Sequence, residues 1–216
     1  MTIRTNYIEN AFPQINIVCK DAMPVLERYG FTTRDIINLC GGIPAPQMTN
    51  IRVTIAATYS SALSVQICTD QHEVARNIDF EIARIDNNYM YVNEKRQGLG
   101  TNLFLTQVRA ALLHKFGKIH LTAMGPEDGL DWNGYYFWAL LGFENTDIAE
   151  YQSWAKAMGR KEPTLSELVQ TQSGRTLWKN TGFTWIGNFY PTMGHPCMAY
   201  LQKHLHRKKI DFYLDV

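Results

Sequence analysis

Two glycines two positions apart, Gly98 and Gly100, stand between a segment of alternating apolar and polar residues and a segment with helical spacing. Glycine lets the backbone turn tightly and come close to a ligand. The first N–H groups of a helix have no partner inside the helix, and its positive dipole end favours negative charge. This junction is therefore suited to a phosphate or pyrophosphate, and Lys95 and Arg96 add positive charge beside it.

The glycine pair by itself also fits an ordinary helix start. The chain has no G-x-x-x-x-G-K-[ST] loop of a nucleoside triphosphatase. It also lacks the third glycine that would complete a G-x-G-x-x-G dinucleotide fingerprint. These two classes of phosphate-binding protein are therefore not indicated.

The segment Lys95–Gly100 resembles the [QR]-x-x-G-x-[GA] loop with which the GNAT superfamily of acyl-CoA N-acyltransferases binds the coenzyme-A pyrophosphate. Further along, Trp132–Glu144 is similar to the later helix of that family, which usually ends in a Tyr-x-x-x-Gly-Phe pattern. The helix and strand expected between them, over Asn102–Ala123, have the family's order and length. The resemblance covers Arg76–Glu144 and implies the GNAT fold. That fold has a strongly twisted, mostly antiparallel sheet, splayed at the cofactor site, with helices on both faces.

The resemblance implies acetyl-CoA or a related coenzyme-A thioester as the acyl donor, with its pyrophosphate on Gln97–Thr101. A backbone amide near Tyr91 or Val92 would polarise the thioester carbonyl. The chain departs from the family at Lys95, where Gln or Arg is usual, and at Arg96, where Gly is common. The cofactor-binding residues expected on this basis are Tyr91, Val92, Lys95, Arg96, Gln97, Gly98, Leu99, Gly100, Thr101, Asn133 and Trp138.

The family's general acid is a tyrosine four residues before the glycine of the Gly-Phe pair, and it protonates the departing thiolate. In this chain that position is Trp138, whose indole N–H is a donor but not an acid. Tyr135 lies one helical turn earlier on roughly the same face, so it is the expected substitute, whereas Tyr136 points elsewhere. The alternative is that these aromatic residues pack the helix onto the sheet.

Acyl transfer to an amine also requires a base, because a lysine-like amine is mostly protonated at neutral pH. Glu81 is the first candidate and Asp79 the second, both on the polar face of the strand predicted over Val74–Ile85. Glu94, beside the glycine loop, is the third. The alternative is a solvated strand face without a catalytic role.

Alternation and turn residues predict the elements that position these groups. Residues 1–47 read as loops with two short helices, Met23–Tyr29 and one running through Asp35–Leu39. The expected strands are Ile51–Thr58, Ala62–Thr69, Val74–Ile85, Tyr89–Val92 and Lys118–Ala123, with a turn at Asp86–Asn88. The expected later helices are one after Gly100, then Trp132–Leu141, Ile148–Met158, Thr164–Thr171, Gly174–Asn180 and Met198–Lys208.

This pattern predicts an α/β protein with a mixed sheet. The expected division is a GNAT-like acyl-CoA-binding core over residues 1–145 and a helical C-terminal extension over residues 146–216, packed on the same domain. Hydrophobic residues make up 45% of the 216, so a packed core is expected. The net charge of +1 and the lack of a long apolar run demand neither a nucleic-acid partner nor a membrane.

The four cysteines form no C-x-x-C pair, which is typical of reduced thiols in the cytoplasm. The pair His195 and Cys197 has no third partner in the sequence, so no metal is expected. The basic run Lys203–Lys209 reads as a solvated helix face rather than an RNA-binding segment.

The leading hypothesis is therefore an N-acyltransferase that moves an acetyl or related acyl group from coenzyme A to an amine of unknown class. A different hypothesis is a GNAT-like module that binds coenzyme A, or serves as an interaction or effector domain, without catalysis. A third is a structural protein whose loop binds nothing. A homodimer is compatible with each of these, and fold alone does not choose among them.

Overall fold

Residues 15–43, 50–93, 98–125 and 133–211 are the part of the chain that the computed structural model describes. The chain forms two compact units that divide between Gly117 and Lys118. We call them the N-terminal unit and the C-terminal unit. The predicted division lies later, after residue 145, so the predicted extension shares its compact unit with the strand and helix that precede it.

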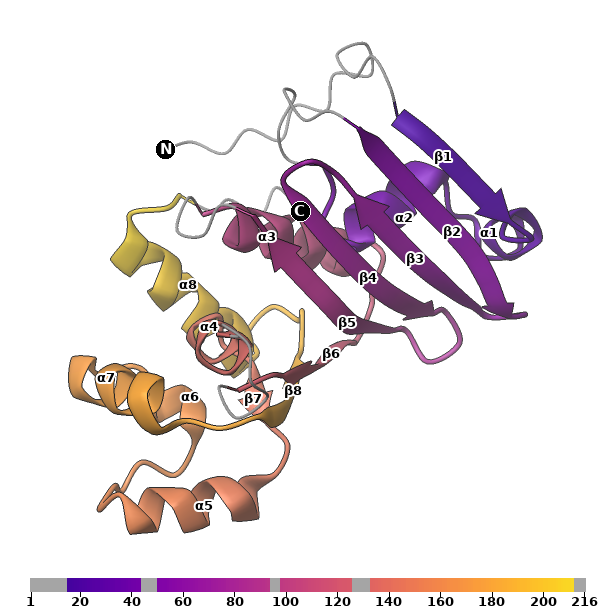
Figure 1. The fold of residues 1–216 in the computed structure, drawn as a ribbon. Coiled ribbons are helices and arrows are strands. Elements are labelled where there is room, and N and C mark those ends of the chain that lie inside the picture. The colour runs from indigo at the N-terminus through magenta and orange to yellow at the C-terminus, as the bar shows by residue number, and fades with distance from the viewer. Residues whose placement is uncertain (1–14, 44–49, 94–97, 126–132, 212–216) are drawn as a thin grey trace. The chain divides into compact units, whose positions relative to one another are not determined.

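The N-terminal unit contains a mixed run of five strands in the order β1-β2-β3-β4-β5 (Figure 1). β1 is parallel to β2, and every later neighbouring pair of this run is antiparallel. The strands are β1 Ile15–Lys20, β2 Ile51–Tyr59, β3 Ala62–Cys68, β4 His72–Asp79 and β5 Arg84–Val92.

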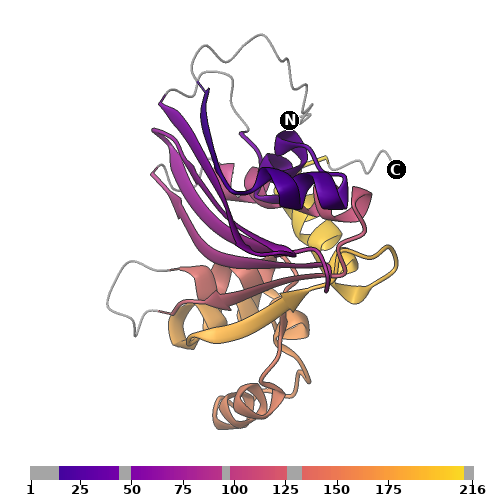
Figure 2. The same cartoon turned by 90° about the vertical axis from the view of Figure 1, so that its right-hand side faces the viewer.

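Three helices lie on one face of this sheet, α1 Met23–Tyr29, α2 Thr33–Leu39 and α3 Leu99–Leu113 (Figures 1 and 2). Alternate strand residues are buried, such as Val53 and Ile55, while their neighbours are more exposed. This is the pattern of a sheet covered by helices on one side. The α/β class predicted from the sequence is confirmed.

Two predictions about these strands are wrong. The turn predicted at Asp86–Asn88 lies inside β5, and the strand predicted over Val74–Ile85 is interrupted by a turn over Phe80–Ala83. Asp79 sets the position of this turn, because its Oδ1 accepts hydrogen bonds from the N–H groups of Glu81 at 3.0 Å and Ile82 at 3.3 Å. Such side-chain-to-backbone bonds favour a turn over the continued strand that alternation predicted.

The sequence did not predict β1, which falls in the segment read as loops and helices. β1 pairs with β2 alone among the described strands, and its side chains are mostly half-buried or exposed. An edge strand of this kind shows little of the alternation of buried and exposed residues by which strands are recognised.

The C-terminal unit contains three antiparallel strands in the order β6-β8-β7. Helix α4 packs on β6 and against α6 and α8, and α6 also packs on β7. The elements in chain order are β6 Lys118–Ala123, α4 Gly134–Leu140, β7 Glu144–Asn145, α5 Ile148–Ala157, α6 Leu165–Leu168, α7 Gln172–Thr181, β8 Trp185–Phe189 and α8 Pro196–Lys208. β8 lies between the helices expected over Gly174–Asn180 and Met198–Lys208, inside the extension that is expected to be helical.

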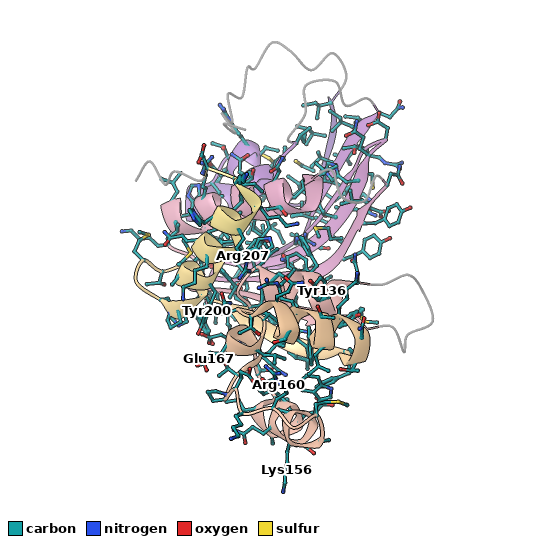
Figure 3. The ribbon with its side chains drawn as sticks, turned by 90° about the vertical axis from the view of Figure 1, so that its left-hand side faces the viewer. Tyr136, Lys156, Arg160, Glu167, Tyr200 and Arg207 are labelled. Atoms are coloured by element: carbon teal, nitrogen blue, oxygen red, sulfur yellow. The ribbon has the colours of Figure 1, made fainter. Side chains whose placement is uncertain are left out.

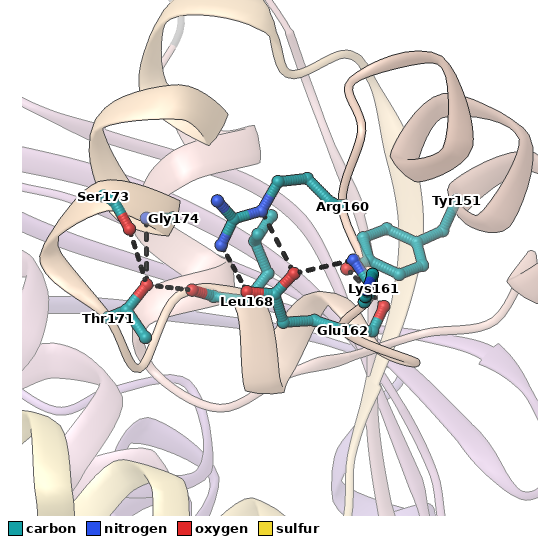
Figure 4. A network of polar contacts seen from close by, with 8 residues as sticks. All are labelled: Tyr151, Arg160, Lys161, Glu162, Leu168, Thr171, Ser173 and Gly174. Carbon is teal, nitrogen blue, oxygen red and sulfur yellow. Dashed lines mark hydrogen bonds and ion pairs between the residues drawn. The ribbon is translucent and has the colours of Figure 1, made fainter.

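Polar contacts stabilise the connections between the helices of this unit (Figure 4). The Thr171 hydroxyl caps α7 by accepting from the N–H of Gly174 at 3.0 Å. A Cβ at Gly174 would lie only 2.0 Å from the carbonyl oxygen of Leu168, so glycine is required where α6 and α7 meet. Arg160 and Glu162 form an ion pair before α6. Every helix in the described part of the chain is too short or too polar to cross a membrane.

Candidate functional site

The first turn of α3 begins at Gly98, which adopts a left-handed φ of 82°. The first helical hydrogen bond runs from the N–H of Asn102 to the carbonyl of Gly98, so the N–H groups of Leu99, Gly100 and Thr101 have no acceptor within the helix. No side chain of a described residue caps this end, and a Cβ at Gly98 would meet nothing within 4 Å. An uncapped helix start with open space beside it is suited to an anionic ligand.

Helix α3 is fixed in place by a buried polar side chain in its middle. Gln107 is 1% exposed, and its Nε2 donates to the carbonyl of Leu39 at the end of α2 at 2.8 Å. Hydrophobic residues of α3 such as Leu103 and Phe104 are buried beside it. The position of the Gly98 turn is therefore set by a well-packed helix.

The expected cofactor residues of the N-terminal unit are only partly described. Lys95, Arg96 and Gln97, together with the base candidate Glu94, lie outside the described residues. Tyr91 and Val92 end β5, and Tyr91 is 45% exposed. Gly98, Leu99, Gly100 and Thr101 form the helix start, with Thr101 buried.

The two leading base candidates lie at the other end of the β4–β5 hairpin. Asp79 is occupied in forming the turn, and Glu81 is exposed within it. β5 has nine residues and runs from the end of this turn to Val92. A strand of that length spans about 25–30 Å, so the structure does not bring Asp79 or Glu81 to the Gly98 turn.

Tyr135, the expected substitute acid, is buried in the C-terminal unit. Its hydroxyl donates to the carbonyl of Lys179 at the end of α7, and its ring lies 6.3 Å from that of Trp178. The indole N–H groups of Trp178 and Trp185 both donate to the Tyr135 carbonyl, at 3.0 and 2.9 Å. These contacts are those of a packing residue, and an additional role as general acid stays a prediction.

The other two expected cofactor residues of this unit, Trp138 and Asn133, differ in burial. Trp138 is 7% exposed, and its ring meets that of Phe143 edge-on at 5.2 Å. Asn133 is exposed at the start of α4 and makes no side-chain cap. The aromatic residues of α4 therefore pack the helix, which is the alternative that the sequence left open.

The structure adds a third partner to the pair that the sequence singled out near the C-terminus. The carboxylate of Glu144 on β7 joins the imidazole of His195 and the thiol of Cys197 at the start of α8. One ligand atom from each lies within 4.8 Å of the others, and His195 Nδ1 is 4.0 Å from Glu144 Oε1. No sequence spacing indicates this meeting, because it depends on how β7 and α8 fold together.

Cys197 is not suited to be a nucleophile in this setting. Its side chain is fully buried, and burial raises the pKa of its thiol to about 12. A thiol with that pKa is protonated at neutral pH, and the thiolate is the nucleophilic form. The same reasoning applies to Cys40 in the N-terminal unit, where burial also raises the thiol pKa to about 12.

The basic run near the C-terminus lies on α8. Lys203, His206 and Arg207 line an open groove of about 510 Å³ with Gln170 and Gln202, and Arg207 is labelled in Figure 3. Arg207 donates to the side chain of Gln170 at 3.3 Å. The α8 residues of the groove are exposed, as expected for a solvated helix face.

No known family model matches the chain, and a search among curated proteins finds no match.

Proposed function

We propose that this chain is an acyl-CoA N-acyltransferase with a GNAT-like fold, and that it binds the coenzyme-A pyrophosphate at the start of α3. The observation that carries this proposal is the uncapped, open turn at Gly98. Three N–H groups and the positive end of a 15-residue helix face that space. The chain order β5, α3, β6, α4 agrees with the order of elements that the resemblance implies.

The proposed reaction is acyl transfer from a thioester to an amine. The amine nitrogen attacks the thioester carbonyl carbon and forms a tetrahedral intermediate, whose oxyanion needs a hydrogen-bond donor. The carbon–sulfur bond then breaks, the coenzyme-A thiolate takes up a proton, and the amine loses one. Because Asp79 and Glu81 lie at the far end of the hairpin, we assign no base among these two residues.

A second candidate function is binding of coenzyme A without catalysis. The observation that favours it is the lack of a free acidic hydroxyl on α4. Trp138 stands at the position of the family's acidic tyrosine, and the Tyr135 hydroxyl already donates to the Lys179 carbonyl. A protein of this kind would bind the cofactor at Gly98 and lack an efficient proton donor for the leaving thiolate.

Calorimetric titration with acetyl-CoA tests the shared part of both functions. We expect Gly98→Glu to abolish binding, because a carboxylate would occupy the open space and repel the pyrophosphate. Gly98→Gln is the matched control, since glutamine has nearly the same size and the same backbone strain at a left-handed φ but carries no charge. Equal affinity of the Gly98→Glu variant and the parent protein would overturn the assignment of the α3 start.

Release of free thiol across a panel of amines then separates the enzyme from the binding module. Turnover that depends on an added amine supports acyl transfer. Tight binding of acetyl-CoA without turnover on small amines, aminoglycoside-like compounds, peptide lysines or peptide N-termini supports the module instead. Activity created by Trp138→Tyr would show that the missing acid limits catalysis.

A further inference from the structure

We propose that Glu144, His195 and Cys197 form a binding site for a divalent ion of the zinc class in the C-terminal unit. This site goes beyond the proposed acyl transfer and shares none of its residues. A thiol, an imidazole and a carboxylate are the three kinds of side chain that bind zinc in proteins. One ligand atom from each lies within 4.8 Å of the other two, although Glu144 is remote from the other residues in sequence.

The fold holds these donors together through a close approach of two backbones. Gly142 has a φ of 91°, and a Cβ there would lie 2.6 Å from the carbonyl oxygen of Cys197. Glycine therefore lets the end of α4 close against the first turn of α8. Two residues later, Glu144 pairs with Asn188 of β8, which fixes its backbone beside α8.

The first turn of α8 fixes the other two donors. His195 is the N-cap of this 13-residue helix, and Pro196 follows it at a position that favours proline. The ring of His195 lies 4.7 Å from the ring of Tyr190, which limits the orientation of the imidazole. Cys197 is thus held in the first turn of α8, two residues after His195, and its side chain is buried.

The exposure of the three side chains suits a metal site with one open position. The thiol of Cys197 is buried, whereas the side chains of His195 and Glu144 are 30% and 38% exposed. An ion held between them would face solvent on the imidazole and carboxylate side. Water is the natural fourth ligand there, as in zinc sites with three protein ligands.

The charges around the site favour a cation. Glu144 is the charged group that acts on the Cys197 thiol, and Tyr200 on α8 lies near both of these residues and near Glu167 of α6. Figure 3 shows Tyr200 and Glu167 close together on this side of the unit. Two carboxylates therefore lie near the thiol, and an ion of charge +2 would offset their negative charge and that of the thiolate that it binds.

Small side-chain movements are enough to complete the geometry. Tetrahedral zinc places adjacent nitrogen, oxygen and sulfur donors about 3.3–3.6 Å apart. The separation of His195 Nδ1 and Glu144 Oε1 is 4.0 Å, and both side chains are exposed enough to rotate. Binding replaces the thiol proton of Cys197 by the metal and releases that proton to solvent.

A purely structural role for the three residues makes a different prediction. His195 Nδ1 accepts the N–H of Cys197 at 3.3 Å and so caps α8, and the Glu144 carboxylate interacts with the thiol. If these contacts are their whole function, the residues stabilise the start of α8 and bind no ion.

Cobalt titration of the full, chelator-treated chain distinguishes the two roles, because Co²⁺ reports on zinc sites spectroscopically. We expect one equivalent to give a thiolate-to-cobalt charge-transfer band and the intense visible bands of a tetrahedral site. Added Zn²⁺ should bleach them. Cys197→Ser should remove the charge-transfer band, while Cys40→Ser, which alters a buried thiol of the other unit, should retain it.

Two further variants keep the test decisive if Cys197→Ser fails to fold. His195→Asn retains a good N-cap, and Glu144→Gln retains the size of the side chain. Each should weaken Zn²⁺ binding at least about tenfold, since loss even of supporting residues around a metal costs that much. His206→Asn, on the exposed face of α8, should not change it. Absence of a charge-transfer band in the folded parent, or full affinity in both variants, would overturn the proposal.

Discussion

The side-chain amides of Asn87 and Gln107 exchange two hydrogen bonds, at 3.0 and 2.9 Å, in the buried contact between β5 and α3. Gln107 also donates to the Leu39 carbonyl, so one side chain joins a strand and two helices. A buried polar network of this kind is stabilising only while each member keeps its partners. It also fixes the helix whose first turn carries the proposed anion site.

We therefore predict that Gln107→Leu lowers the free energy of unfolding by about 2–6 kcal/mol. The substitution leaves the Asn87 amide and the Leu39 carbonyl buried without partners, and each such group costs about 1–3 kcal/mol. Urea unfolding followed by circular dichroism measures the change. The double variant Asn87→Leu with Gln107→Leu should recover part of the loss, and additive losses would contradict a coupled pair.

The Tyr135 hydroxyl gives a prediction about both stability and turnover. Tyr135→Phe removes the hydrogen bond to the Lys179 carbonyl, so the free energy of unfolding should fall by about 1 kcal/mol. If Tyr135 is also the acid, turnover on a good acceptor should fall about 10²–10⁴-fold with little change in acetyl-CoA affinity.

Thermal unfolding and single-turnover kinetics on the same preparation separate these effects. Tyr136→Phe, the adjacent residue on another face of α4, serves as the control and should change neither. Lower stability with unchanged turnover would remove Tyr135 from the mechanism and leave it a packing role.

Acid should destabilise the protein through His72. Burial, with the nearby Arg76 guanidinium as a second cause, lowers the pKa of His72 to about 4. An unfolded histidine titrates near 6.5, so between about pH 6.5 and 4 the unfolded chain binds a proton that the folded chain does not. The free energy of unfolding therefore falls as the pH drops through this window, by on the order of 3 kcal/mol in total, and this group has no effect above it.

Urea midpoints collected across that window measure the effect. His72→Gln should flatten the acid side of the curve, because glutamine does not titrate. The exposed residue His206 provides the control, and His206→Asn should leave the curve unchanged. An unaltered slope in His72→Gln would assign the acid sensitivity to other groups, among them buried His204, whose pKa burial also lowers to about 4.

Removing the methyl group of Ala83, in the β4–β5 turn, should stabilise the protein. Ala83 has a φ of 49°, in the left-handed region that favours glycine. Ala83→Gly should therefore raise the free energy of unfolding by about 0.5–1 kcal/mol by relieving this strain. Ala56→Gly, in the middle of β2, should instead lower it by a similar amount. Destabilisation by both substitutions would show that the chain does not turn at Phe80–Ala83.

Local patterns predicted much of the fold because they act over short distances. Lys118–Ala123 and Met23–Tyr29 have the predicted bounds, since Gly117 precedes the strand, and Pro24 and Gly30 mark the start and the end of the helix. The β4–β5 turn was misplaced because two backbone N–H groups donate hydrogen bonds to the Asp79 carboxylate, and these outweigh the apolar alternation of Ile78, Phe80 and Ile82. Phe80 also stacks on Tyr29 of α1 at 4.8 Å, a tertiary contact that no strand pattern contains.

The two candidate sites also differ in whether their residues are adjacent in sequence. The Gly98 turn could be predicted because its glycines and the helix that follows are adjacent in sequence. The Glu144–His195–Cys197 cluster could not, because it forms only when β7 and β8 pair and α8 closes on Gly142. The true position of the β4–β5 turn also explains why the leading base candidate fails. Glu81 was expected on the face of a strand, but it lies in the turn at the end of the hairpin.

The order of strands in the two units has a consequence for how the chain folds during synthesis. From β2 to β5 the N-terminal sheet grows by hairpins, so each strand meets its neighbour soon after it leaves the ribosome. In the C-terminal unit β8 lies between β6 and β7, although it is made after both. β7, whose one partner among the described strands is β8, must therefore wait until residue 189 has emerged, with apolar residues such as Phe143 unprotected in the meantime. A nascent chain stalled before β8 should bind chaperones through this second half, and one released after α8 should not.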